Sequence, residues 1–167
     1  MNKNINGIFD VIENDVQEIL NIYNYYIKNT IITFEEVEIS LEVMKSRVNQ
    51  IAEKFPYLVY KENNVVLGFA YISPWKERSA YRYSVESTIY LNNNCVRKGI
   101  GTKLYSELIN QVKKSELHSV IGGISLPNDA SIKLHEKLGF NYLGKFSEVG
   151  YKFNNWIDVG YWKLILK

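Results

Sequence analysis

Residues 87–108, STIYLNNNCVRKGIGTKLYSEL, predict a strand, a basic glycine-bearing loop and an amphipathic helix in direct succession. β-Branched and aromatic residues at 87–91 favour a strand, which the asparagine run after it ends. Apolar residues recur at helical spacing after the loop, so one face of the helix is expected to be buried. A helix that begins at a glycine turn presents N–H groups without intrahelical partners and the positive end of its dipole. The stretch therefore predicts an anion site, with a plain glycine-capped turn as the alternative.

The loop at residues 97–102 carries the groups that a phosphate would need. Gly99 and Gly101 allow close approach to the backbone, and Arg97 and Lys98 add positive charge. The loop matches neither common nucleotide motif, because it lacks the third glycine of G-x-G-x-x-G and the Gly-Lys-Ser/Thr end of a Walker loop. The rest of the chain must therefore decide which anion is bound.

Length and composition limit the remaining possibilities. The 167 residues suffice for a buried core, and we expect a single domain over residues 1–167. A net charge of +2 without a basic tract argues against nucleic acid, and one cysteine excludes an internal disulfide. No apolar run reaches the roughly 20 residues of a membrane span, and the polar start is unlike a signal peptide. We expect a cytoplasmic protein that binds neither membrane nor metal.

The order of helices and strands is typical of one mixed sheet. The expected order is β α α β β β α β α β β, with Ser40 and Asn128 as helix N-caps and Gly139 after a helix end. The strand–helix–strand succession over residues 87–124 predicts a parallel pair with a right-handed crossover. Hairpins on either side predict antiparallel partners. We therefore expect an α/β fold with a mixed, mostly antiparallel twisted sheet of about seven strands, a central parallel pair and about four helices.

The element order and the 97–102 loop resemble the GNAT (GCN5-related) N-acetyltransferase family, whose loop for the pyrophosphate of acetyl-CoA has this form. Residues 134–140, LHEKLGF, are similar to the closing helix of that family, which usually carries tyrosine where His135 stands. Val96 departs from the family loop, in which glutamine or arginine is usual at this position. Further short segments resemble the phosphinothricin and L-amino-acid N-acetyltransferase branch. They are residues 74–76 (PWK), 85–88 (VEST), 126–129 (LPND), 149–152 (VGYK) and 156–162 (WIDVGYW).

The resemblance implies transfer of an acetyl group from acetyl-CoA to the α-amino group of an amino acid or an amino-acid-like toxin, such as phosphinothricin, methionine sulfoximine or methionine sulfone. It implies direct transfer in a ternary complex, with Glu86 as the general base that deprotonates the amine. Partial burial among tyrosines is expected to raise the pKa of Glu86. His135 is implied as a supporting catalytic residue, because imidazole titrates near neutrality. A solvent-facing strand glutamate and a structural helix histidine are the alternatives.

The resemblance also implies which residues bind the two substrates. A backbone N–H near Leu91 is expected to stabilise the oxyanion. As bare sequence, residues 76–78 are more often a solvated turn, and only the resemblance makes a role in substrate binding equally favoured. The implied acetyl-CoA residues are Ile89, Tyr90, Leu91, Arg97, Lys98, Gly99, Ile100, Gly101, Thr102, Asn128 and Ser131. The implied residues for the amine substrate are Phe34, Lys76, Arg78, Tyr81 and Thr88.

The resemblance further implies a homodimer, which the aromatic residues near the C-terminus permit. A place in the core is the alternative for these residues, which are Tyr151, Phe153, Trp156, Tyr161 and Trp162. Two other functions remain open. One keeps the fold and acetylates a different amine, such as a protein N-terminus, a polyamine or an aminoglycoside. The other is a non-catalytic acetyl-CoA-binding sensor. Lys76 and Arg78 disfavour the cationic acceptors, and the presence of both Glu86 and His135 disfavours the sensor.

Overall fold

The computed structural model describes residues 5–95 and 99–166. Within these residues the chain forms seven strands and four α-helices, and the strands are hydrogen-bonded in the order β1-β2-β3-β4-β5-β7-β6. The β4–β5 pair is parallel, whereas the β1–β2, β2–β3, β5–β7 and β6–β7 pairs are antiparallel. The predicted mixed sheet is confirmed. The strands are β1 (Gly7–Asp10), β2 (Tyr57–Glu62), β3 (Val65–Pro74), β4 (Ser84–Leu91), β5 (Ser119–Leu126), β6 (Asn141–Lys152) and β7 (Asn155–Ile165), and the helices are α1 (Val16–Asn29), α2 (Leu41–Ala52), α3 (Ile100–Val112) and α4 (Asp129–Lys137).

The chain divides into two compact units, and β4 contributes to both. Unit one contains residues 1–24, 39–73 and 88–115, and unit two contains residues 25–38, 74–87 and 116–167. The expectation of a single domain stays a prediction. Among residues 5–95 and 99–166, no helix combines the length and the apolar character needed to cross a membrane.

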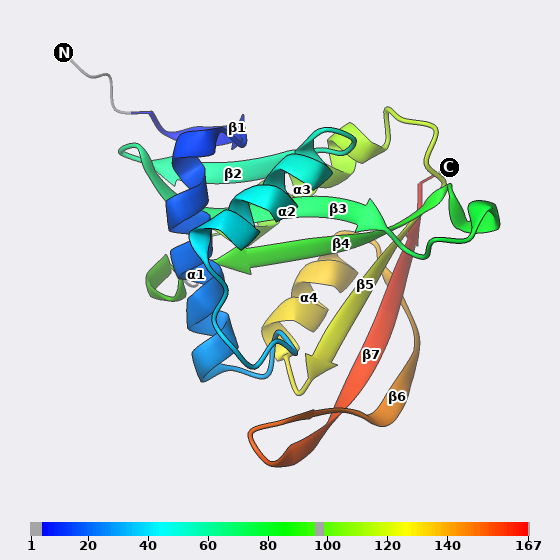
Figure 1. The fold of residues 1–167 in the computed structure, drawn as a ribbon. Coiled ribbons are helices and arrows are strands. Elements are labelled where there is room, and N and C mark those ends of the chain that lie inside the picture. The colour runs from blue at the N-terminus through cyan, green and yellow to red at the C-terminus, as the bar shows by residue number, and fades with distance from the viewer. Residues whose placement is uncertain (1–4, 96–98, 167) are drawn as a thin grey trace. The chain divides into compact units, whose positions relative to one another are not determined.

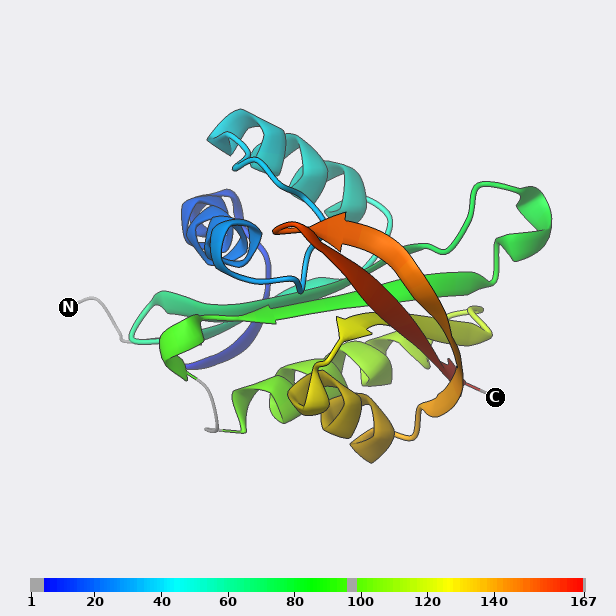
Figure 2. The ribbon, with the colours of Figure 1, turned by 90° about the horizontal axis from the view of Figure 1, so that it is seen from below.

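In unit one, helices cover both faces of β2 and β3. The N-terminal part of α1 and all of α2 lie on one side, and α3 lies on the other (Figures 1 and 2). The Ser40 hydroxyl accepts a hydrogen bond from the Val43 N–H (3.3 Å), which confirms the predicted cap of α2. On α3, Ile100, Leu104 and Leu108 are at most 2% exposed, as their helical spacing predicts. The helix that follows the glycine loop is thus anchored by its apolar face.

A buried ion pair joins the start of α1 to β2 in unit one. Lys61 Nζ lies 2.6 Å from Asp15 Oδ1, and the two residues are 8% and 4% exposed. The other carboxylate oxygen, Asp15 Oδ2, accepts a hydrogen bond from the Ile12 N–H (3.1 Å). Because both charges are removed from water, the loss of either one leaves its partner buried and unpaired.

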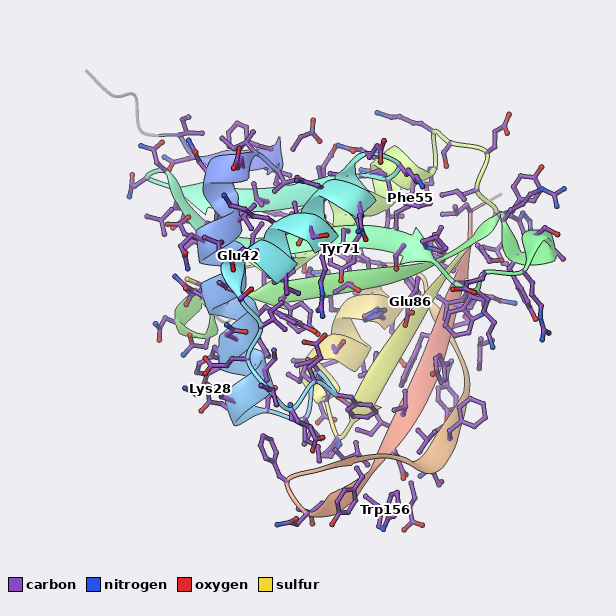
Figure 3. The ribbon with its side chains drawn as sticks, in the orientation of Figure 1. Lys28, Glu42, Phe55, Tyr71, Glu86 and Trp156 are labelled. Carbon is purple, nitrogen blue, oxygen red and sulfur yellow. The ribbon has the colours of Figure 1, made fainter. Side chains whose placement is uncertain are left out.

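In unit two, β7 lies between β5 and β6 and pairs antiparallel with both, and α4 lies beside β5 (Figure 1). The Asn128 side chain caps α4 by accepting from the Ser131 N–H (3.2 Å), as predicted. A long hairpin joins β6 to β7, and Trp156 lies near its turn end (Figure 3). Phe153 and Asn154 at this turn have φ of 51° and 59°, the pattern of a type I′ turn. The twist of such a turn matches that of the two strands.

Replacing Lys61 by methionine is expected to lower the free energy of unfolding by about 3 kcal/mol, because Asp15 then stays buried without its cation. Urea denaturation measures the change. Lys45→Met is the matched control, since Lys45 pairs with Glu13 at the surface and its loss should cost less than about 1 kcal/mol. Equal transition midpoints for Lys61→Met and the wild type would contradict the buried pair.

Candidate active site

Glu86 lies where β4 pairs with β5 in unit two, with residues 84–86 opposite residues 119–121 (Figure 3). Its carboxylate lies beside Gly123 of β5, because a methyl group added to Gly123 would be 3.2 Å from Glu86 Oε1. Gly123 itself is exposed. Burial raises the pKa of Glu86. A carboxylate of raised pKa next to an open glycine can take a proton from a bound amine.

Tyr161 forms the other side of the position at Gly123. It pairs with Gly123 across β5 and β7, and the same added methyl group would lie 3.3 Å from Tyr161 Cε1. The rings of Trp75 and Phe146 pack edge-on against Tyr161, with centroid distances of 5.7 and 5.6 Å. Burial raises the pKa of the Tyr161 hydroxyl, and the charge of Glu86 raises it further. The surroundings of the carboxylate are therefore largely aromatic.

A cleft of about 670 Å³ in unit two shares Tyr161 with these surroundings. Three lysines line it, Lys76, Lys145 and Lys163, so the cleft carries an excess of positive groups. Lys145 forms an ion pair with Asp158, which raises the pKa of the lysine and lowers that of the carboxylate. A cationic cleft with aromatic walls suits an acceptor that carries a carboxylate or a second anionic group.

The sequence-predicted acceptor residues are only partly brought together. Lys76 and Tyr81 line the cleft. Arg78 is exposed and precedes the 3-10 turn Ser79–Tyr81, outside the cleft lining. Phe34 packs on Gly150 of β6 in unit two, where a methyl group would lie 2.3 Å from Phe34 Cζ. Thr88 follows Glu86 by two residues on β4, in the part of the strand that belongs to unit one.

His135 packs against the opposite face of β5. A methyl group added to Gly122 would lie 2.5 Å from His135 Nε2, and consecutive residues of a strand direct their side chains to opposite faces. Glu86 and His135 therefore lie on different sides of β5. His135 Nδ1 donates to the Ser131 carbonyl (2.8 Å), since a carbonyl oxygen can only accept. Burial lowers the pKa of His135, and the bond to Ser131 opposes this shift, so a neutral imidazole is favoured.

The predicted anion site lies at the start of α3 in unit one. Gly99 is the N-cap residue in the left-handed conformation (φ 73°), and nothing lies within 4 Å of a methyl group added there. The first helical bond runs from the Lys103 N–H to the Gly99 carbonyl (3.2 Å). The Ile100 side chain is buried and Gly101 has none, so these two residues can bind an anion only through their backbone N–H groups. The backbone N–H of Thr102 also belongs to the first turn of the helix. Val96, Arg97 and Lys98 lie outside the described residues.

The remaining residues implied for acetyl-CoA lie on β4 and α4. In unit one the Tyr90 ring packs against the rings of Tyr23 and Phe69, with centroids 5.3 and 5.4 Å apart. Leu91 lies over Gly68, where a methyl group would be 2.5 Å from Leu91 Cδ2, and Ile89 is half-buried. In unit two, Ser131 and Asn128 meet at the start of α4 through the cap bond. The oxygen of Asn128 is thus engaged in capping.

Sequence reasoning missed five residues of this site. The clearest signal in the sequence for these residues is the pair Gly122-Gly123, since glycine inside a strand often marks the close approach of another group. The role of Tyr161 and the two lysines depends on strand register, which the sequence does not reveal. Among residues 5–95 and 99–166, no cluster of three His, Cys, Asp or Glu residues can hold a metal ion. The missed residues are Gly122, Gly123, Lys145, Tyr161 and Lys163.

The chain is similar in sequence to named acetyltransferases. The chain is 36% identical to a phosphinothricin N-acetyltransferase of Streptomyces viridochromogenes, over 89% of this chain and 81% of the relative. It is 32% identical to an L-methionine sulfoximine/L-methionine sulfone acetyltransferase of Pseudomonas aeruginosa, over 91% of this chain and 90% of the relative.

A solved structure of the same family has a closely similar fold. The crystal structure of a GNAT superfamily phosphinothricin acetyltransferase from Sinorhizobium meliloti, in complex with acetyl-CoA, matches with a TM-score of 0.92 at 33% identity. The match covers 96% of this chain and 88% of that chain. The family described as "Acetyltransferase (GNAT) domain" matches residues 8–160. The chain therefore belongs to the GNAT acetyltransferase family and is an acetyl-transferring enzyme.

Proposed function

We propose that this enzyme transfers the acetyl group of acetyl-CoA to the α-amino group of an amino acid or an amino-acid-like toxin. Phosphinothricin, methionine sulfoximine and methionine sulfone are the acceptors that the names of the relatives suggest. The observation that carries the proposal is the position of Glu86. Its carboxylate combines a raised pKa with an open glycine neighbour, and Tyr161 beside it also lines the cationic cleft. A cationic cleft disfavours polyamines and aminoglycosides, because like charges repel.

The proposed reaction is direct transfer in a ternary complex. Acetyl-CoA supplies a thioester, whose carbonyl carbon forms a bond to the amine nitrogen while the carbon–sulfur bond breaks. CoA leaves as its thiolate, which takes up a proton from water and departs as the free thiol. Glu86 takes the proton that the amine must lose, directly or through one water. A backbone N–H near Leu91 is the proposed donor to the oxygen on which negative charge develops. Lys76 and Tyr81 hold the acceptor, and the lysine attracts its carboxylate.

The residues at the start of α3 fit the pyrophosphate of acetyl-CoA. Gly99 leaves open space where any other residue would place a Cβ, and its left-handed conformation disfavours other residues. The N–H groups of Ile100, Gly101 and Thr102 begin the helix and present its positive end. Arg97 and Lys98 remain proposed contributors of charge. In unit two, the side-chain N–H groups of Asn128 and the hydroxyl of Ser131 are the proposed partners of the pantetheine amides.

His135 keeps a supporting role in this proposal, on the face of β5 opposite Glu86. Its bond to the Ser131 carbonyl leaves Nε2 as the acceptor, and a neutral imidazole there receives a proton more readily than it donates one. We therefore assign His135 the role of packing α4 against Gly122. Any proton that its imidazole accepts is held on the face of β5 opposite Glu86.

We further propose that the enzyme is a homodimer. The outer edge of β6 exposes a group of large apolar side chains, which is unusual on a monomer surface and typical of protein interfaces. These side chains are Tyr142, Val149 and Tyr151 of β6, followed by Phe153 at the turn and Trp156 at the start of β7. The exposed Leu143 and Phe146 line the cleft and are not counted in this group.

Replacing Glu86 by glutamine is expected to lower kcat about 100-fold or more, since the amide cannot take the proton. In the wild type, kcat/KM should fall as the pH falls through the raised pKa of Glu86, and this limb should vanish in Glu86→Gln. Release of the CoA thiol measures both. Glu116→Gln, at an exposed position of unit two, is the matched control. Unchanged rates over the whole pH range would contradict Glu86 as the base.

An amine panel tests the substrate class. We expect the highest kcat/KM with phosphinothricin, methionine sulfoximine, methionine sulfone or a free amino acid, because each offers an anion to the cationic cleft. Spermidine, an aminoglycoside and a peptide with a free N-terminus are the competing classes. Preferential turnover of one of these would overturn the substrate assignment. Tight acetyl-CoA binding by calorimetry without turnover of any amine would favour the sensor.

Replacing Trp156 by lysine is expected to shift the equilibrium from dimer toward monomer, because the change places a charge on the apolar surface. Analytical ultracentrifugation over a concentration series measures the shift. Val37→Lys, at an exposed apolar residue of unit two outside this surface, is the control. A wild-type chain that sediments as one chain at all concentrations would contradict the homodimer.

A further inference from the structure

A lysine buried at the end of β6 contacts the loop of residues 30–38 in unit two. Lys152 is 1% exposed, and its Nζ donates a hydrogen bond to the Thr33 carbonyl at 2.8 Å. The same ammonium lies 5.0 Å from the centroid of the Phe153 ring. A buried ammonium group is stable only where protein oxygens or opposite charges replace its lost hydration. The loop supplies such an oxygen, so the lysine and the loop stabilise each other.

Two glutamates of the same loop act on this lysine. Burial lowers the pKa of Lys152, whereas the charges of Glu36 and Glu35 raise it. The cation therefore lies close to the negative charge of the loop, of which the Oε2 atom of Glu35 is buried and Glu36 is exposed. Removal of the ammonium would take away a hydrogen bond to the Thr33 carbonyl and a positive charge close to Glu35 and Glu36.

The position of Phe34 depends on the same strand. Gly150 and Lys152 are two residues apart on β6, so their side-chain directions share one face. The Phe34 ring occupies the space above Gly150 that a side chain would fill, and Thr33 beside it is tied to Lys152. The consecutive loop residues Thr33 and Phe34 thus contact Lys152 and Gly150, which point to the same face of β6. Phe34 remains 42% exposed, so one side of its ring is available to a ligand.

We propose that Lys152 is a positioning residue, which ties the Thr33 carbonyl to β6 and so holds Phe34 over Gly150. Phe34 is one of the residues that the family resemblance implies for the amine substrate, and we assign its ring as the apolar wall of the acceptor site. The role of the wall rests on the proposed function, whereas the tie between Lys152 and the loop is independent of it. A loosened loop weakens binding of the acceptor equally in the ground state and in the transition state. The expected signature is a higher KM for the acceptor with kcat nearly unchanged.

The experiment compares the wild type with Lys152→Met, which keeps the length of the side chain and removes its charge and donors. We expect the acceptor KM to rise about tenfold, while kcat and the KM for acetyl-CoA change less than about threefold. Hydrogen exchange of the ligand-free protein provides a readout without catalysis. Amides of residues 30–38 should exchange at least about tenfold faster, with no comparable change on α3. Lys152→Arg, which keeps a cation and N–H donors, should restore most of both values.

Two further variants separate the positioning role from general destabilisation. Lys61→Met removes the buried lysine of unit one and should leave the acceptor KM and the exchange of residues 30–38 unchanged. Gly150→Ala displaces the Phe34 ring directly, and because the clash is with the far end of that ring, the fold should tolerate it. It should raise the acceptor KM without the loss of the tie to Thr33.

The outcomes are distinct. A folded Lys152→Met with wild-type acceptor KM, or with wild-type exchange at residues 30–38, overturns the inference. If Lys152→Met does not fold, Lys152→Gln is measured in the same way, and wild-type values there overturn it equally. If the wild type acetylates no amino acid or analogue, the proposed function fails. The exchange data then still decide whether Lys152 holds the loop.

Discussion

The arrangement of unit two depends on two adjacent residues without side chains at the centre of β5. Above Gly122 there is room for His135 and hence for α4, and above Gly123 there is room for Glu86 and Tyr161. Glycine inside a strand costs stability, because it loses more backbone entropy and packs nothing. Here the pairing with β7 on one side, from residue 119 to residue 126, compensates for this weakness. β5 thus separates His135 on one face from Glu86 and Tyr161 on the other, and its two glycines let these side chains lie close to its backbone.

The raised pKa of Glu86 has a thermodynamic cost as well as a catalytic use. A carboxyl group whose folded pKa lies above its unfolded value stabilises the protein below the unfolded pKa, and this contribution is lost as pH rises through the folded value. At neutral pH the enzyme therefore holds a carboxylate in a place that favours the acid. Apolar packing elsewhere, as on Ile100 and Leu104 of α3, offsets such local losses.

Much of the fold follows from local sequence signals, whereas the site depends on long-range register. Ser40 and Asn128 bond to N–H groups three residues on, so their caps are readable from the sequence. The start of β4 is harder to predict from the sequence. The tyrosine-rich residues 81–83 have strand propensity, yet Ser79–Tyr81 form a 3-10 turn and β4 begins at Ser84. Tyr161, Lys145 and Lys163 reach the cleft only through the pairing of β6 and β7 with β5, which no local pattern encodes.

The irregular pairing of β6 has a consequence for solubility. β6 is the last strand of the hydrogen-bonded order, and its register shifts between Tyr142 and Gly144 and again between Phe146 and Gly150. A flat edge strand of this length, rich in aromatic residues, would offer a continuous template for further strands and hence for fibrils. Each shift bends the strand and breaks the regular row of backbone groups. The edge can therefore present apolar side chains to a partner of matching shape while it resists open-ended growth of the sheet.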